Sequence, residues 1–167
     1  MIRDATEADL PGILDIYNEV ILGSTAVYTD DPVPLEERRQ WLLARRALGY
    51  PVLVAVDEGG EVLGFASFGD FRNWPGYRHS CEHSVHVRAG RRGRGVGRHL
   101  VEALFPRAAA LGKHVMLAAV DADNAASILF HERLGFVRVG HFHEVGRKFD
   151  RWLDLVFLQR FLEPPVA

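Results

Sequence analysis

Cysteine is nearly absent from this chain: Cys81 is the only one among 167 residues. A single thiol excludes an intramolecular disulfide and a cysteine-rich zinc cluster, and it agrees with a reducing compartment. The sequence also lacks an apolar run of the roughly 20 residues that a membrane-spanning helix needs, and no apolar stretch follows a basic start at the N-terminus. These absences predict a cytoplasmic protein without a membrane-spanning segment.

Neither sign of charge dominates, because 20 lysines and arginines stand against 22 carboxylates and the formal net charge is −2. This balance argues against a nucleic acid as the main partner. Arginine is nevertheless dense between Arg88 and Arg98, so that segment needs its own explanation. No repeat, low-complexity tract or linker divides the chain, and we expect a single domain over residues 1–167.

Hydrophobic periodicity and turn residues predict the order β-α-α-β-β-β-α-β-α-β-β. The expected strands cover residues 2–5, 52–56, 62–68, 82–87, 114–120, 136–144 and 152–161. The expected helices follow Thr6 and Pro34 and cover residues 95–111 and 124–134. The apolar face of the second helix is expected to carry Leu35, Trp41, Leu42 and Leu48. This order indicates an α/β fold of the α+β type, in which helices flank a mixed, mostly antiparallel central sheet.

A glycine-rich loop, Arg92-Gly93-Arg94-Gly95-Val96-Gly97, stands where a strand hands over to a helix. The first N–H groups of a helix lack intrahelical partners and its dipole is positive there, so this loop is suited to an anion. Arg92, Arg94 and Arg98 add positive charge for a phosphate-rich ligand. The alternative is a solvated basic turn whose glycines only shape the bend.

Two better-known phosphate loops fail on particular residues. A P-loop needs lysine and a hydroxyl residue where Arg98 and His99 stand. A dinucleotide fingerprint needs glycine in place of Arg98 and belongs after the first strand of a β-α-β unit.

The loop resembles the signature of the GNAT superfamily of acetyltransferases, Arg/Gln-x-x-Gly-x-Gly/Ala, through Arg92, Gly95 and Gly97. The second part of that family's pattern is similar to the segment from Asn124 to Phe136. More narrowly, the chain resembles the phosphinothricin and methionine sulfoximine acetyltransferases through the segments 82–85, 129–132 and 148–155. The resemblance spans essentially the whole chain. It implies the GNAT fold and transfer of acetyl from acetyl-CoA to the α-amine of a small amino-acid-like acceptor.

The same resemblance implies the residues of the site. Acetyl-CoA is expected to contact three strand residues along its pantetheine arm, the glycine loop at its pyrophosphate and one asparagine, namely Val85, His86, Val87, Arg92, Gly93, Arg94, Gly95, Val96, Gly97, Arg98 and Asn124. The acceptor amine is expected near Arg72, Asn73, Trp74, Glu82 and Arg133. A homodimer is also implied.

Direct attack by an amine needs a base near the donor carbonyl, and Glu82 is the candidate. The alternative for Glu82 is a strand-edge carboxylate paired with an arginine. A backbone N–H near Val87 could hold the oxyanion if the strand splays there. His131, which stands where the wider family often has tyrosine, is either the acid for the departing thiolate or a helix-face histidine packed on the core.

Other side chains suggest rival chemistry. Cys81 beside Glu82 invites an acetyl-cysteine intermediate, but an inert cysteine is favoured because direct transfer needs no covalent step. His83-x-x-His86 and His141-x-His143 resemble zinc pairs, yet four ligands do not assemble, and we expect no metal. The rival functions are a peptide or protein N-acetyltransferase and a non-catalytic acetyl-CoA sensor. 

Overall fold

The computed structural model describes residues 1–163, so residues 164–167 of the expected single domain lie outside the described part. The strands are β1 (Ile2–Asp4), β2 (Val52–Val56), β3 (Val62–Asp70), β4 (Ser80–Val87), β5 (Val115–Asp121), β6 (Val137–Lys148) and β7 (Arg151–Phe161). The α-helices are α1 (Leu10–Gly23), α2 (Leu35–Ala47), α3 (Val96–Ala110) and α4 (Ala125–Arg133). Short 3-10 turns are η1 (Glu7–Asp9), η2 (Pro75–Tyr77) and η3 (Ala89–Arg91). The predicted order of strands and helices is confirmed.

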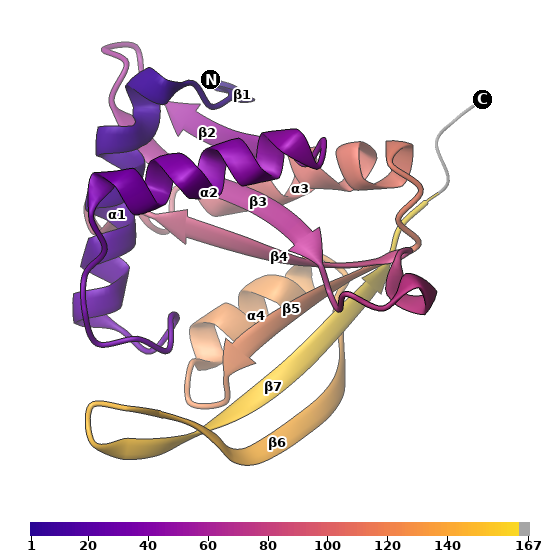
Figure 1. The fold of residues 1–167 in the computed structure, drawn as a ribbon. Coiled ribbons are helices and arrows are strands. Elements are labelled where there is room, and N and C mark those ends of the chain that lie inside the picture. The colour runs from indigo at the N-terminus through magenta and orange to yellow at the C-terminus, as the bar shows by residue number, and fades with distance from the viewer. Residues whose placement is uncertain (164–167) are drawn as a thin grey trace.

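The strands form one sheet in the order β1-β2-β3-β4-β5-β7-β6. Every neighbouring pair is antiparallel except β4 and β5, which run parallel in the middle of the sheet. The expected mixed, mostly antiparallel sheet is therefore confirmed (Figure 1). Its one parallel pair is joined by α3, as a crossover between parallel strands requires.

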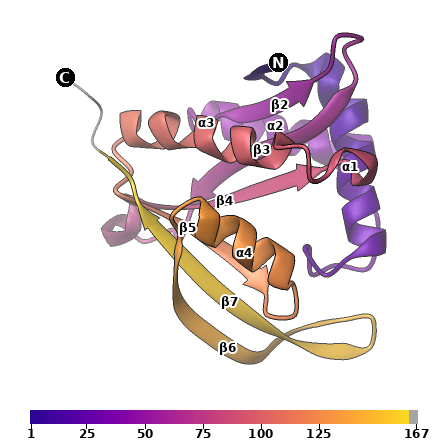
Figure 2. The same cartoon turned by 180° about the vertical axis from the view of Figure 1, so that it is seen from behind.

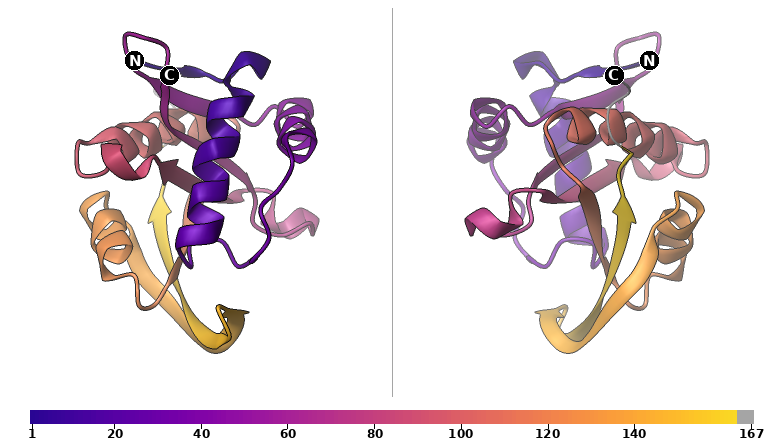
Figure 3. Two further views of the ribbon diagram at one scale, coloured as in Figure 1. Left: turned by 90° about the vertical axis from the view of Figure 1, so that its left-hand side faces the viewer. Right: turned by 90° about the vertical axis from the view of Figure 1, so that its right-hand side faces the viewer.

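Helices cover both faces of the sheet. In Figures 1 and 2, α1 and α2 lie on one face and α3 and α4 on the other. Figure 3 shows the same layers from the side, with α2 and α3 on opposite sides of the sheet. Two apolar clusters fill the layers. One includes Leu100 and Leu104 of α3, and the other includes Ile13 of α1 and Leu42 of α2.

The central parallel pair comes apart along its length. β4 and β5 pair only from Ser80 to Glu82, opposite residues 115–117. After that point β5 continues in register with β7 alone. Figure 1 shows the two strands close together at one end and separated at the other. The opening lies at the carboxyl ends of two parallel strands, a common place for ligand sites in sheets.

Three local expectations need correction. Thr6 precedes the η1 turn, and α1 itself begins at Leu10. Leu35 and Leu48 are exposed, because the inward face of α2 is formed instead by Leu42 with Arg38, which is buried. β6 extends past residue 144, because a bulge there lets the strand pair with β7 again up to its last residue.

A two-residue turn joins β6 to β7. Phe149 and Asp150 have φ of +50° and +57°, which is the conformation of a tight type I′ hairpin. Within residues 1–163, no helix is both long enough and apolar enough to cross a bilayer.

Candidate active site

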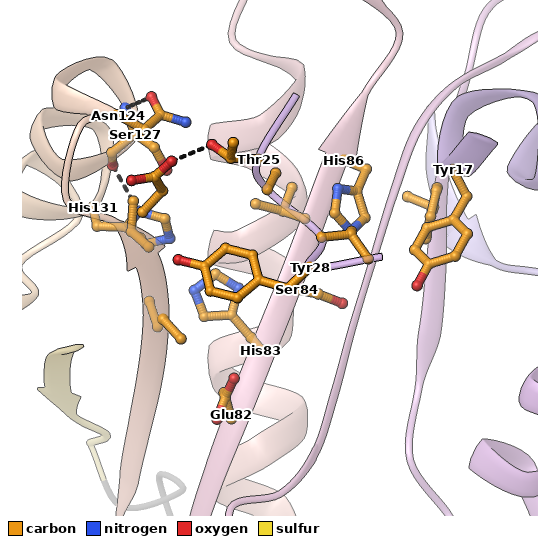
Figure 4. Close-up of a pocket in the computed structure, with 18 of the residues that line it drawn as sticks. Tyr17, Thr25, Tyr28, Glu82, His83, Ser84, His86, Asn124, Ser127 and His131 are labelled. Carbon is orange, nitrogen blue, oxygen red and sulfur yellow. Dashed lines mark hydrogen bonds between the residues drawn. The ribbon is translucent and has the colours of Figure 1, made fainter. Parts of the chain in front are cut away.

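A cavity of about 540 Å³ lies where β4 and β5 separate. Its walls come mainly from β4, β5, α2, α4 and the segment after α1, with single residues from α1, β3 and β7. Figure 4 shows Glu82, Ser84 and His86 along β4, with Asn124 and His131 on the other side of the cavity. This volume is within the range of about 300–1,000 Å³ that is typical of small-molecule sites.

The backbone of β4 faces this cavity beyond Glu82. On the side of β4 that faces β3, the N–H of Arg88 donates to the carbonyl of Leu63 at 3.0 Å. The alternation of an antiparallel ladder then directs every second residue, including residues 84 and 86, to β3. The backbone groups of Val85 and Val87 therefore face the gap between β4 and β5. This is the splay that an oxyanion donor near Val87 requires.

Glu82 lies at the point where the two strands part. Its side chain lines the cavity and makes no hydrogen bond or ion pair with the residues described here. The expected alternative, a carboxylate paired with an arginine, is therefore not what the described residues show. Burial raises the pKa of Glu82 above its ordinary value. An unpaired carboxylate with a raised pKa is suited to accepting a proton.

His131 also lines the cavity, from the last turn of α4, and it is buried. Its Nδ1 lies 2.7 Å from the backbone carbonyl of Ser127. A carbonyl only accepts, so Nδ1 carries the proton and Nε2 is left with a lone pair. Burial lowers the pKa of His131, which keeps the ring neutral near pH 7. In this state His131 offers an acceptor at Nε2 rather than an acid.

Asn124 is placed by the start of α4, as its N-cap. Its side-chain oxygen accepts from the N–H of Ser127 at 3.0 Å. This bond is the usual capping interaction of asparagine, and it leaves the amide NH₂ free. Because Asn124 lines the cavity, that NH₂ group is available to a ligand.

The glycine loop follows β4 directly. Gly93 and Gly95 have φ of +74° and +81°, a region that glycine enters without steric cost. The first bond of α3 joins the N–H of His99 to the carbonyl of Gly95 at 3.0 Å. The N–H groups of residues 96–98 therefore have no partner inside the helix and are available to an anion.

The arginines around this loop fall into two groups. Arg88 and Arg91 pair with Glu61, and Arg98 pairs with Glu102 at 2.8 Å. Arg92 donates from Nε to the carbonyl of Val87 at 3.1 Å and makes no ion pair with the described residues. Arg94 likewise makes no ion pair with them, so these two keep their charge available to a ligand.

Four of the expected acceptor residues lie outside the cavity. Arg72, Asn73 and Trp74 are exposed in the loop between β3 and η2, and Trp74 is 74% exposed. The Arg72 guanidinium lies over the rings of Phe71 and Tyr77. Arg133 is exposed at the end of α4. The cavity thus brings together five of the expected site residues, Glu82, Val85, His86, Asn124 and His131. The four exposed residues named above do not line it.

The cavity also has a wall that sequence reasoning missed. α1 and α2 supply Tyr17, Arg38, Trp41 and Arg45. In α2 the three residues Arg38, Trp41 and Arg45 follow the i, i+3, i+7 spacing of an inward helix face. Two arginines on the inward face of a helix were the sequence signal that could have indicated this wall of the cavity.

The segment Thr25–Tyr28 closes the cavity on a further side. It is tied down by Lys148, whose buried ammonium donates to the carbonyls of Ile21, Ser24 and Val27 at 2.6, 2.7 and 2.8 Å. Thr25 also hydrogen-bonds to Asp121 of β5 (Figure 4). The wall is therefore fixed by polar contacts to distant strands.

The rival side chains have other surroundings. Cys81 is fully buried in the apolar core, and burial raises its thiol pKa to about 12. His83 is buried beside His131, and burial lowers its pKa to about 3. Away from the cavity, His141 and His143 both hydrogen-bond to one oxygen of Asp154, at 2.8 and 2.9 Å. The potential ligand atoms of these three residues lie within 4.8 Å of one another.

Comparison with known proteins identifies the family. The model of the acetyltransferase (GNAT) family matches residues 13–136, which include both the glycine loop and the asparagine segment. The chain belongs to the GNAT family of acetyltransferases. The resemblance stated from the two motifs, and the fold that it implied, are confirmed.

Individual relatives of this GNAT acetyltransferase cover almost its full length. An L-methionine sulfoximine/L-methionine sulfone acetyltransferase from Pseudomonas paraeruginosa is 54% identical over 163 residues, which are 98% of this chain and 95% of the relative. The solved structure of a GNAT phosphinothricin acetyltransferase from Sinorhizobium meliloti in complex with acetyl-CoA has a TM-score of 0.93 and 38% identity, over 97% and 88% of the two chains. That of a ribosomal-protein-alanine N-acetyltransferase from Brucella melitensis has a TM-score of 0.94 and 48% identity, over 97% and 99%.

Proposed function

We propose that this GNAT acetyltransferase transfers the acetyl group of acetyl-CoA to the α-amine of a small amino-acid-like acceptor. Methionine sulfone, methionine sulfoximine and phosphinothricin represent the acceptor class, which the names of the Pseudomonas and Sinorhizobium relatives support. The observation that carries the proposal is the unpaired Glu82 carboxylate in a cavity of about 540 Å³, at the point where β4 and β5 part.

The donor is proposed to lie along the gap between β4 and β5. Its pantetheine arm would lie along β4 at Val85, His86 and Val87, where the backbone groups of Val85 and Val87 face the gap, and it would contact the free amide NH₂ of Asn124. Its pyrophosphate would lie at the start of α3, against the loop Arg92–Gly97 and Arg98. The unbonded N–H groups of residues 96–98 and the positive end of the helix support this placement.

The transfer is proposed to proceed by direct attack. Glu82 takes a proton from the acceptor ammonium, directly or through water, and the freed amine attacks the thioester carbon. A C–N bond forms while the carbonyl electrons move to oxygen, where a β4 N–H near Val87 stabilises the oxyanion. The added nitrogen still carries one proton more than an amide and gives it up as the intermediate collapses. Collapse breaks the C–S bond and releases the N-acetyl product and the CoA thiolate, which takes up a proton, while Glu82 returns its own proton to water.

His131 is proposed to position the reactants rather than to protonate the thiolate. Its Nε2 is unprotonated while Nδ1 donates to Ser127, and burial holds the ring neutral. A thiol has a pKa of about 8.5, so the thiolate leaves without an acid.

The expected acceptor loop remains part of the proposal. The expected acceptor residues lie outside the cavity, so they would contact the acceptor only after a rearrangement that brings them to it. These residues are Arg72, Asn73, Trp74 and Arg133. A homodimer is proposed, and the exposed apolar side chains on β6 and β7 support it: Val137, Val139, Phe142, Val145, Trp152 and Phe161. A cytoplasmic location, and the lack of any metal or nucleic-acid requirement, are proposed on the sequence grounds given above.

A screen of CoA thiol release tests the function. Methionine sulfone, methionine sulfoximine and phosphinothricin should each give acceptor-dependent thiol, whereas peptides with an N-terminal alanine should not. The name of the Brucella protein favours the rival, a peptide or protein acetyltransferase, for which the opposite pattern is expected. Binding of acetyl-CoA without thiol release from any amine would indicate a sensor.

A further inference from the structure

We propose that Arg45 binds the α-carboxylate of the acceptor, so that the cavity selects amino acids over simple amines. This assignment rests on the proposed function and names the group of the substrate that the site recognises. Arg45 lines the cavity from α2. It belongs neither to the glycine loop nor to the residues expected at the acceptor.

The Arg45 guanidinium occupies the space that a side chain at Gly69 would fill. A Cβ atom built on Gly69 would lie 1.7 Å from one terminal nitrogen of Arg45 and 2.7 Å from its Cζ. The guanidinium therefore rests directly on the backbone of β3 at this glycine. Any side chain at position 69 would push it away.

The register of the sheet places that guanidinium beside the proposed base. Gly69 is the direct partner of Glu82 in the ladder between β3 and β4. Directly opposed residues project to the same face of a sheet, and neighbouring strands lie about 4.8 Å apart. The Arg45 guanidinium, which rests on β3, and the Glu82 side chain, which projects from β4, thus meet the cavity on the face covered by α1 and α2.

This spacing suits an α-amino acid. The amine and the carboxylate of such an acceptor are attached to one carbon atom, so the groups that bind them must be close neighbours. With the amine directed at Glu82, the carboxylate reaches the adjacent strand β3, against which the Arg45 guanidinium rests. A guanidinium accepts a carboxylate through two parallel hydrogen bonds.

Arg45 has no competing partner among residues 1–163. Its guanidinium makes no hydrogen bond or ion pair with these residues, although the side chain is half-buried. The nearby Asp70 is already bound by Lys113 at 2.6 Å and by Tyr50 at 2.5 Å. A cation in such surroundings is stabilised by an incoming anion, because burial is costly for an unpaired charge.

The two other candidate arginines are less suited. Arg38 lines the same cavity, but its guanidinium is paired with Glu37 and lies over the ring of Tyr17 at 4.0 Å. Arg72, which was expected to recognise a carboxylate, is exposed outside the cavity. Of these three arginines, only Arg45 both lines the cavity and makes no ion pair with a described residue.

Kinetics with matched acceptors test the assignment. Methionine sulfone is compared with its carboxamide, which keeps the amine and the sulfone but has no carboxylate. Wild-type protein should favour the acid, and R45Q should raise its KM by about 10- to 100-fold, the equivalent of one charge-assisted pair. The KM for the carboxamide and the Kd for acetyl-CoA should hardly change. Arg39, exposed on the same helix, supplies the control variant R39Q, which should behave as wild type.

A second variant guards against a folding defect in R45Q. G69A keeps Arg45, but its methyl group fills the space of the guanidinium. It should raise the KM for methionine sulfone, and not that for the carboxamide, as R45Q does. The proposal is overturned if R45Q keeps the wild-type preference, or if R72Q loses the preference and R45Q does not.

Calorimetric binding of methionine sulfone to the CoA complex separates the two proposals. Binding that is weakened by R45Q, without thiol release by wild type, would contradict the proposed function and support Arg45. Normal turnover by wild type, with unchanged methionine sulfone binding by R45Q, would support the proposed function and contradict the role of Arg45. If methionine sulfone does not bind to wild type, both proposals are contradicted.

Discussion

His131 donates a hydrogen bond from Nδ1 to the carbonyl of Ser127, one helical turn earlier, at 2.7 Å. This bond decides which ring nitrogen holds the proton, and it leaves Nε2 as an acceptor on a side chain that lines the cavity. The neutral ring therefore positions a ligand rather than supplying a proton.

The variant H131N tests this role. The asparagine NH₂ can replace Nδ1 as donor to Ser127, while the lone pair of Nε2 is lost. We expect kcat to fall less than about 10-fold, because a general acid would contribute roughly 10²–10⁴-fold. A loss above 100-fold, together with loss of the basic limb of the kcat profile against pH, would show that His131 is the acid.

The unpaired Arg94 should matter more for the donor than Arg98, which is bound to Glu102. R94Q is expected to weaken CoA binding by about 3- to 10-fold, as loss of a charge-assisted contact predicts. R98Q should weaken it less. Isothermal titration with CoA at two salt concentrations measures both effects, and equal or reversed losses would contradict this division.

Cys81 should be dispensable. Because burial raises its thiol pKa to about 12, very little thiolate is present at neutral pH. C81A is expected to keep turnover within about threefold, since no step of direct attack uses a thiol. Native protein should also resist iodoacetamide. An acetyl-cysteine trapped by mass spectrometry would refute direct transfer.

Lys148 should support both stability and the acceptor wall. K148M leaves three carbonyls, which are partly or fully buried, without their donor, and we expect the free energy of unfolding to fall by about 3 kcal/mol. The acceptor KM should rise because Thr25–Tyr28 loses its anchor. Urea unfolding and kinetics measure these changes. The neighbouring exposed Arg147 supplies the control R147M, and equal effects of both variants would argue against an anchoring role.

Much of the fold could be predicted from local pattern. The order of strands and helices follows from periodicity and glycine positions, and Asn124 caps α4 as its residue type suggests. The turn of the last hairpin was less accessible, because Phe149 adopts positive φ without being glycine or asparagine. The extension of β6 past its bulge is set by pairing with β7, which is a tertiary effect.

The residues that stand in the recognised motifs were more predictable than the rest of the cavity wall. Motifs in sequence order located Glu82, Asn124 and His131, and all three line one cavity. Arg45 was missed because its environment depends on Gly69, 24 positions later, and on the pairing of that glycine with Glu82. Such a contact is set by sheet register, which a single sequence does not reveal.

Protonation of Glu82 gives the central claim its pH dependence. Burial raises its pKa, so the active carboxylate form should be lost, as pH falls, at a higher pH than for an exposed glutamate. The kcat/KM for methionine sulfone should therefore decline on the acid side with a midpoint above the ordinary glutamate value.

The most direct measurement is CoA thiol release by E82Q with methionine sulfone as acceptor, alongside acetyl-CoA binding by calorimetry. E58Q, changed at an exposed turn residue, is the matched control. We expect kcat to fall by at least about 100-fold for E82Q, the usual contribution of a general base, with loss of the acid limb of the pH profile and unchanged acetyl-CoA affinity. Full turnover by E82Q with the same pH profile as wild type would contradict the assignment of Glu82 as the base.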